Sequence, residues 1–145
     1  MTTGTTNFTP QQWSGIAGAP LLAAMWVSAD TRASTRATLA AVRAYRDARG
    51  SYDTELLRDV LATSPADAIK RPHDRDALRR EAPAALRQAI EIIDRVATTH
   101  EQAEYRRFVL TLAEAAGRAA RKRGPLGRSR AERDALRSIT AILER

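Results

Sequence analysis

Cysteine is absent from this chain of 145 residues, which excludes a disulfide framework, a thiolate metal site and a cysteine nucleophile. Aromatic residues make up only 5% of it, so alanine and the branched aliphatic residues must fill most of the core. No long apolar run is present either: the stretch 15–27 is shorter than the roughly 18 residues that a membrane span needs, and Pro20 interrupts it. Because residues 1–7 also lack the basic start of a signal peptide, we expect a cytoplasmic protein with no membrane partner.

Lysine is nearly missing too, although the chain is strongly basic, with a net charge of +7 and a pI of about 10.9. Of the 24 basic residues only Lys70 and Lys122 are lysine, and the others are arginine. A composition rich in arginine and alanine is typical of proteins from genomes of high GC content, without selection for function. The same charge would also attract phosphates or an acidic partner. Composition leaves both interpretations open.

Apolar residues form 43% of the chain and recur at the three- and four-residue spacing of amphipathic helices, and no alternating strand pattern occurs. The spacing is clearest in 86–97, in 105–119 and in 136–143. We therefore predict an all-α protein, a compact bundle of about six or seven helices that ends in an antiparallel helical hairpin. A single all-helical domain would span 9–145, after a disordered tail of residues 1–8.

Capping boxes mark several predicted helix starts, because two side chains then satisfy the free amides of a first turn. The predicted boxes are Thr9 with Gln12, Thr99 with Gln102, and Ser129 with Glu132. For a short helix that carries Leu56 and Leu57, the predicted cap is Ser51 or Asp53. Gly50 is expected to end a helix that spans 32–49, and Gly124 is expected to adopt the left-handed backbone conformation that follows a last turn.

The arrangement of the helices is predicted from their apolar faces and their prolines. Pro20 and Pro83 should kink or end the helices that contain them, because proline removes a donor and clashes with the preceding turn. The segment 21–27 is apolar nearly all round, so we expect it to be deeply buried. The helices 86–97 and 105–119 are expected to pack antiparallel at the centre. Four of their side chains should be nearly inaccessible: Ile90, Ile93, Phe108 and Leu112.

We predict no catalytic residue, no metal site and no cofactor, because no nucleotide-binding or nucleophile motif occurs. His100 and Glu104 share a helical face and would supply a nitrogen and an oxygen to a metal, but no motif designates two further ligands. Glu101 and Glu104 are better explained by the positive end of a helix dipole. Glu91 and Asp94 also form a pair of carboxylates, which we assign to a solvated face with the arginines four residues before and after Glu91.

One group of basic residues surrounds the loop 124–129. Its seven cations are Arg118, Arg121, Lys122, Arg123, Arg128, Arg130 and Arg133. Cations close to the start of the last helix would hold a phosphate or a sulfate. No aromatic residue interleaves them, and the turn is longer and richer in proline than a helix-turn-helix motif requires. Nucleic-acid binding is therefore the less favoured interpretation of this cluster.

Short motifs at the two ends of the chain resemble a family of uncharacterised bacterial helical proteins. They are Phe8–Trp13, Ala19–Leu21, Phe108–Leu110, Ala115–Ala116 and Gly124–Gly127, followed by Ser129 and Glu132. The closing helical pair is also similar to TerB-like tellurite-resistance domains, which are all-helical and in some members bind metal through acidic loop residues. The resemblance implies an all-helical fold and a stress-related role. It does not imply a metal site, because no acidic residue lies between Arg121 and Ala131.

The sequence therefore predicts a small non-enzymatic cytoplasmic binding or interaction protein, whose partner is an unspecified protein or an anionic ligand. The alternative is a protein that binds nucleic acid or another polyanion through the cluster between Arg118 and Arg133. The sequence does not specify the ligand, the partner or the oligomeric state.

Overall fold

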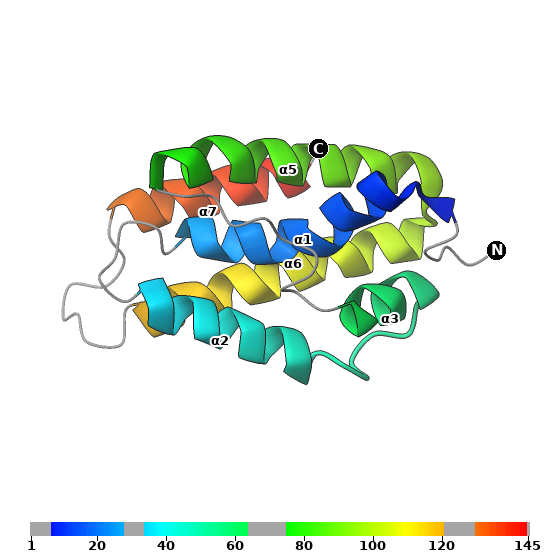
Figure 1. The fold of residues 1–145 in the computed structure, drawn as a ribbon, viewed down its shortest axis with the longest axis horizontal. Helices are drawn as coiled ribbons and strands as arrows, with labels where there is room; N and C mark the ends of the chain where they lie inside the picture. Colours follow the sequence, from blue (N-terminus) through cyan, green and yellow to red (C-terminus); the bar gives the residue numbers. More distant parts are fainter. Residues whose placement is uncertain (1–6, 28–33, 64–74, 121–129, 145) are drawn as a thin grey trace.

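The computed structural model describes residues 7–27, 34–63, 75–120 and 130–144, and within these ranges the protein is all-α. Six helices occur in these ranges, and they pack as a compact bundle whose arrangement is seen in Figure 1. They are α1 (Pro10–Val27), α2 (Ser34–Asp47), α3 (Glu55–Ala62), α5 (Arg75–Val96), α6 (Thr99–Ala120) and α7 (Arg130–Leu143). The predicted fold class is confirmed. The predicted end at Gly124 and the predicted cap Ser129 lie outside the described residues.

Helix α1 forms the centre of the bundle and lies between α5 and α6 (Figure 1). Its small apolar residues are buried on several sides, among them Ala17, Ala23 and Ala24, as expected for a helix that is apolar nearly all round. The prediction that 86–97 and 105–119 pack directly against each other at the centre is wrong. The two helices make only minor contact, because residues 16–27 of α1 are apolar nearly all round and therefore occupy the place between them.

The four side chains expected to be inaccessible are nevertheless buried. Ile93, Phe108 and Leu112 are fully buried, and Ile90 is 4% exposed. Their apolar faces pack against α1 and its neighbours rather than chiefly against each other. Hydrophobic spacing therefore identified which faces turn inward, but not which helix each face meets.

The start of α1 carries two local stabilising motifs. The backbone N–H of Thr9 donates to Gln12 Oε1 at 3.0 Å, and the N–H of Gln12 donates to Thr9 Oγ1 at 3.1 Å, which confirms the predicted capping box. Phe8 is buried, and its ring centroid lies 5.8 Å from that of Trp13. This contact between the residues before and after the cap is a hydrophobic staple, so Phe8 does not belong to a disordered tail. Residues 1–6 lie outside the described part of the chain.

Neither proline ends its helix. Helix α1 runs through Pro20 and α5 runs through Pro83. The prediction that these prolines could end their helices is therefore wrong. Pro20 cannot donate to the carbonyl of Ile16 four residues earlier, but the buried hydroxyl of Tyr105 donates to that oxygen at 2.7 Å. The corresponding carbonyl before Pro83 belongs to Arg79, an exposed residue that water can reach.

The capping box of α6 begins one residue earlier than predicted. The N–H of Thr98 donates to Glu101 Oε1 at 2.9 Å, and the N–H of Glu101 donates to Thr98 Oγ1 at 3.2 Å, so Thr98 replaces Thr99 as the cap. Two adjacent threonines both satisfy the spacing rule. Gln102 is used elsewhere: its side-chain amide donates to the carbonyl of Ala97 at 3.0 Å, at the end of α5.

The predicted closing hairpin is present, since α7 runs antiparallel to α6 (Figure 1). Helix α7 also packs on α1 and α5, and its residues Ile139 and Ile142 are buried. Arg106 of α6 connects the last residues of α7 with α5. Its Nε donates to the carbonyl of Leu143 at 2.6 Å, and its two Nη atoms donate to the two carboxylate oxygens of Asp94 at 2.8 Å each. Asp94 is exposed, as expected for the solvated face assigned to it from the sequence, but its partner Arg106 comes from another helix.

The described helices include none that is long and apolar enough to cross a membrane.

Candidate functional site

The predicted basic cluster lies partly outside the described residues. Arg118 lies in the last turn of α6, and Arg130 and Arg133 lie in the first turn of α7; all three residues are exposed. Figure 1 shows these two helix ends at the same end of the bundle. The other predicted members are not among the described residues: Arg121, Lys122, Arg123 and Arg128.

Glu104, a candidate metal ligand from the sequence, is used to hold the start of α3. Glu104 is only 3% exposed, and its carboxylate accepts a hydrogen bond from Thr54 Oγ1 at 2.6 Å. It also accepts from the backbone N–H groups of Asp53 and Thr54, each at 3.3 Å. Thr54 is the N-cap of α3, and its hydroxyl oxygen accepts from the N–H of Leu57 at 3.4 Å. The predicted caps Ser51 and Asp53 are therefore wrong, although Asp53 takes part through its backbone.

Electrostatics keeps Glu104 ionised in spite of its burial. Burial by itself raises the pKa of a carboxyl group, but the hydrogen bonds from Thr54 and from the two backbone N–H groups, together with His100 nearby, lower the pKa of Glu104 below its ordinary value. His100 is exposed, and its Nε2 lies 3.7 Å from Glu104 Oε2. Arg107 lies 3.8 Å from the same oxygen. No three potential metal ligands gather anywhere in the described ranges.

Two buried tyrosines are also hydrogen-bonded to the backbone. The hydroxyl of Tyr45 in α2 donates to the carbonyl of Val60 in α3 at 2.6 Å, and the hydroxyl of Tyr105 donates to Ile16 as described above. Burial raises the pKa of Tyr45 to about 12, against a smaller opposite effect of Arg49, and burial raises the pKa of Tyr105 further. Both hydroxyl groups therefore stay protonated near neutral pH and act as donors that join helices.

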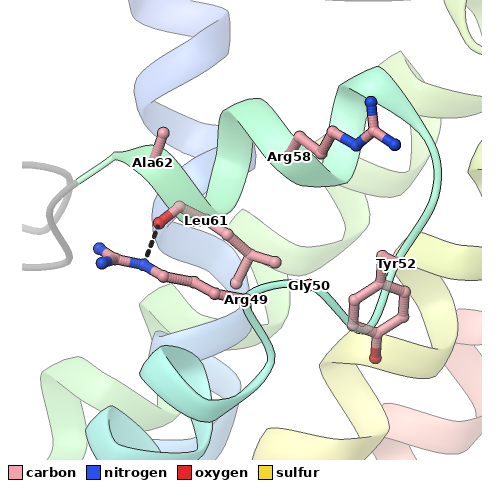
Figure 2. A pocket seen from close by; sticks show the side chains of 6 residues that line it. All are labelled: Arg49, Gly50, Tyr52, Arg58, Leu61 and Ala62. Carbon is pink, nitrogen blue, oxygen red and sulfur yellow. Dashed lines mark hydrogen bonds between the residues drawn. The ribbon is translucent and has the colours of Figure 1, made fainter.

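An open pocket lies at the corner between α2 and α3, and we call it the corner pocket. It has a volume of about 420 Å³ and is lined by Arg49, Gly50, Tyr52, Arg58, Leu61 and Ala62 (Figure 2). Gly50, with φ of 85°, adopts the left-handed conformation expected at the end of α2 and turns the chain toward Tyr52. On α3, Arg58 precedes Leu61 and Ala62 by three and four residues, so the three share one helical face.

The lining of the corner pocket combines two cations with apolar surface, and no carboxylate is among its residues. Arg49 Nε donates to the carbonyl of Leu61 at 3.3 Å, which fixes its guanidinium against the end of α3. Arg58 is exposed, and its guanidinium makes no hydrogen bond or ion pair with the part of the chain that the structure describes. Leu61 is buried below them. The chemistry of this lining suits a small anionic ligand with an apolar body.

Tyr52 forms one wall of the corner pocket and is itself held from behind. Its ring meets the ring of Phe108 edge-on, with centroids 5.8 Å apart, and the guanidinium carbon of Arg107 lies 5.1 Å from the Tyr52 ring centroid. A wall that is packed in this way is largely formed before any ligand arrives, which reduces the entropy lost on binding.

Sequence reasoning did not identify Arg49 or Arg58 as site residues. Both are single members of an abundant residue type, nine positions apart, and nothing in their local pattern distinguishes them. The one available signal was Gly50, because a turn between two helices brings the residues on either side of it together. A second pocket, of about 330 Å³, lies between α1 and α5 and includes Gln11, Gln12 and Gln88, but no charged residue lines it.

No protein-family model, no curated protein and no solved structure matches this chain. The resemblance to TerB-like domains therefore stays an expectation from the sequence.

Proposed function

We propose that this protein is a non-enzymatic binding protein that takes a small anionic ligand in the corner pocket. The observation that carries this proposal is the composition of the lining, with Arg49 and Arg58 beside the apolar side chain of Leu61 and no acidic residue. Guanidinium groups bind carboxylates and phosphates through paired N–H donors, and an apolar floor holds the rest of a small ligand.

The buried titratable groups support a binding role over a catalytic one. Glu101 caps α6, Glu104 holds the start of α3, and the Tyr45 and Tyr105 hydroxyls donate to backbone carbonyls. A general acid or base needs a proton-transfer group within reach of a bound substrate. These four groups are instead occupied inside the bundle, and none of them is among the residues that line the corner pocket. The cytoplasmic location and the stress-related role expected from the sequence carry no weight in this proposal.

The test is a panel of small anions, including phosphate, monocarboxylates and dicarboxylates, added to the full chain while its melting temperature is followed. A ligand that binds the folded state raises the melting temperature. The variant Ala62→Phe fills the corner pocket from an exposed position and should abolish the shift. Ala84→Phe introduces the same side chain at an exposed position of α5 and should leave the shift unchanged. Equal shifts of the melting temperature in both variants would show that the anion binds at another site.

Polyanion binding is the second candidate, because Arg118, Arg130 and Arg133 are all exposed at one end of the bundle. It predicts binding to duplex DNA with a log–log salt slope no steeper than about −4, and loss of binding when the three arginines become glutamine. A matched control changes three exposed arginines of other helices: Arg43 of α2 and Arg87 and Arg95 of α5. If neither variant alters binding, or if no binding occurs at about 0.15 M salt, this candidate is rejected.

A further inference from the structure

The two cations of the corner pocket point in different directions. Figure 2 shows the guanidinium of Arg49 on one side of the pocket and that of Arg58 on the other, turned away from it, with Leu61 between them. A single carboxylate or phosphate would meet one of these groups but not both in this arrangement. We propose, building on the function proposed above, that the ligand is a dicarboxylate whose two charged ends are separated by a short apolar or aromatic body.

The first end of such a ligand would meet Arg49. Its Nε is used by the carbonyl of Leu61, so the guanidinium is already oriented and its two Nη atoms remain for a ligand. Two parallel N–H groups match the two oxygens of a carboxylate. Orientation by Leu61 lowers the entropy lost when the carboxylate binds.

The body of the ligand would lie over the apolar part of the lining. Leu61 and Ala62 come from one face of α3, and the ring of Tyr52 stands at the side, fixed by Phe108 and Arg107. This surface offers no acidic group to repel the ligand, and Leu61 lies between the two cations (Figure 2). It therefore suits methylene groups or an aromatic ring better than a chain of hydroxyl groups.

The second end would meet Arg58, which shares its helical face with Leu61 and Ala62. Arg58 is exposed, so turning toward a bound carboxylate costs it little desolvation. Once the first end is held by Arg49, the second contact forms within one complex, so it adds affinity without a second loss of translational freedom. The two guanidinium groups are then neutralised by the two carboxylates of the ligand.

The experiment compares adipate and terephthalate with their half-amides, which have the same length but one charge, by calorimetric titration of the full chain. Each diacid should bind about tenfold or more tightly than its half-amide. Arg58→Gln should reduce the affinity for the diacid by at least tenfold more than the affinity for the half-amide. Arg87→Gln, at an exposed position on α5, removes the same charge away from the pocket and should change neither.

The outcomes separate this inference from the proposed function. If diacid and half-amide bind equally and Ala62→Phe abolishes both, the corner pocket is a binding site but the preference for two charges is wrong. If the diacids do not bind while another anion of the panel does, the dicarboxylate class is wrong and the proposed function stands. If no anion binds in a way that Ala62→Phe abolishes, both proposals fail. Because Arg49 holds the end of α3, Arg49→Gln is interpreted only if its melting temperature matches the wild type.

Discussion

At the scale of single residues, the tyrosine hydroxyls resolve local problems of hydrogen bonding. Pro20 deprives the carbonyl of Ile16 of its helical donor, and Tyr105, which is 0% exposed, supplies a replacement. Tyr45 also donates to a carbonyl, that of Val60, but this oxygen accepts a second hydrogen bond from the N–H of Thr63 at 3.1 Å. The two hydroxyls are therefore chemically alike but differ in what their removal would leave behind.

Tyr105→Phe should lower the free energy of unfolding by about 1–3 kcal/mol, because it leaves a buried carbonyl without a donor. Tyr45→Phe should cost less, about 0.5–1.5 kcal/mol, since Val60 keeps the N–H of Thr63. Urea denaturation measures both. In the background Pro20→Ala, which restores a helical N–H to Ile16, the cost of Tyr105→Phe should shrink. An unchanged cost in that background would show that the hydroxyl does not act through this carbonyl.

Two helical glycines differ in the space around them. A Cβ at Gly117 would lie 2.8 Å from Glu132 Oε1, and Glu132 is 1% exposed, so its side chain has little room to withdraw. A Cβ at Gly15 meets nothing within 4 Å. Gly15→Ala should therefore raise the free energy of unfolding by about 0.5–1 kcal/mol through helix propensity. Gly117→Ala should lose that gain and destabilise the protein; an equal gain in chemical denaturation at both sites would contradict this.

At the scale of secondary-structure elements, Glu104 ties α6 to the first turn of α3. It accepts three hydrogen bonds from Asp53 and Thr54, and Thr54 in turn caps the helix through Leu57. The start of a short helix of 8 residues is thus held by a carboxylate from a long one. Since an isolated helix of this length is marginal in water, α3 depends on this contact and on its buried face.

Glu104→Gln should lower the free energy of unfolding by about 1–3 kcal/mol near pH 7, because charge-assisted hydrogen bonds become neutral ones. The pKa of Glu104 is lowered in the folded state, so its contribution is fully present above the unfolded pKa of about 4.3 and is lost as pH falls through the folded pKa. The stability difference between wild type and variant should thus be constant above about pH 5.5 and shrink in acid. Glu114→Gln, at an exposed position of α6, is the control and should show no such loss.

At the scale of the whole molecule, one core runs through the bundle around α1. Buried residues of α1, α2, α3, α5, α6 and α7 belong to the same hydrophobic cluster. Aromatic side chains are few, but Tyr45, Tyr52 and Phe108 meet edge-on where α2, α3 and α6 approach one another. The corner pocket lies beside this aromatic group, so its wall is part of the core.

Leu112→Ala should reduce the free energy of unfolding by about 2–5 kcal/mol, because Leu112 is fully buried and its loss leaves a cavity. Leu39→Ala removes the same atoms from a side chain that is 60% exposed and should change stability by less than about 0.5 kcal/mol. Denaturant titration of both variants tests whether the core is placed correctly. Similar costs at the two positions would show that it is not.

The sequence was most informative where a structure depends on residues within one turn of each other. The capping box of Thr9 and Gln12 was predicted correctly, and α2 ends ahead of Gly50, as predicted. The box at α6 was displaced by one residue, because Thr98 and Thr99 both fit the same spacing. Phe8 was assigned to the tail, since a hydrophobic staple adds only one apolar residue to a polar segment.

By itself the sequence determined the helical class, the inward faces and several helix ends, because caps and apolar periodicity act over three or four residues. Only the tertiary structure decided that α1 lies at the centre and that the Tyr105 hydroxyl donates to the carbonyl of Ile16, 89 residues away. It also decided that Glu104 holds α3 and that Arg49 and Arg58 line one pocket. Such pairings depend on which apolar faces and which buried polar groups satisfy each other across the bundle, and no local pattern records that choice.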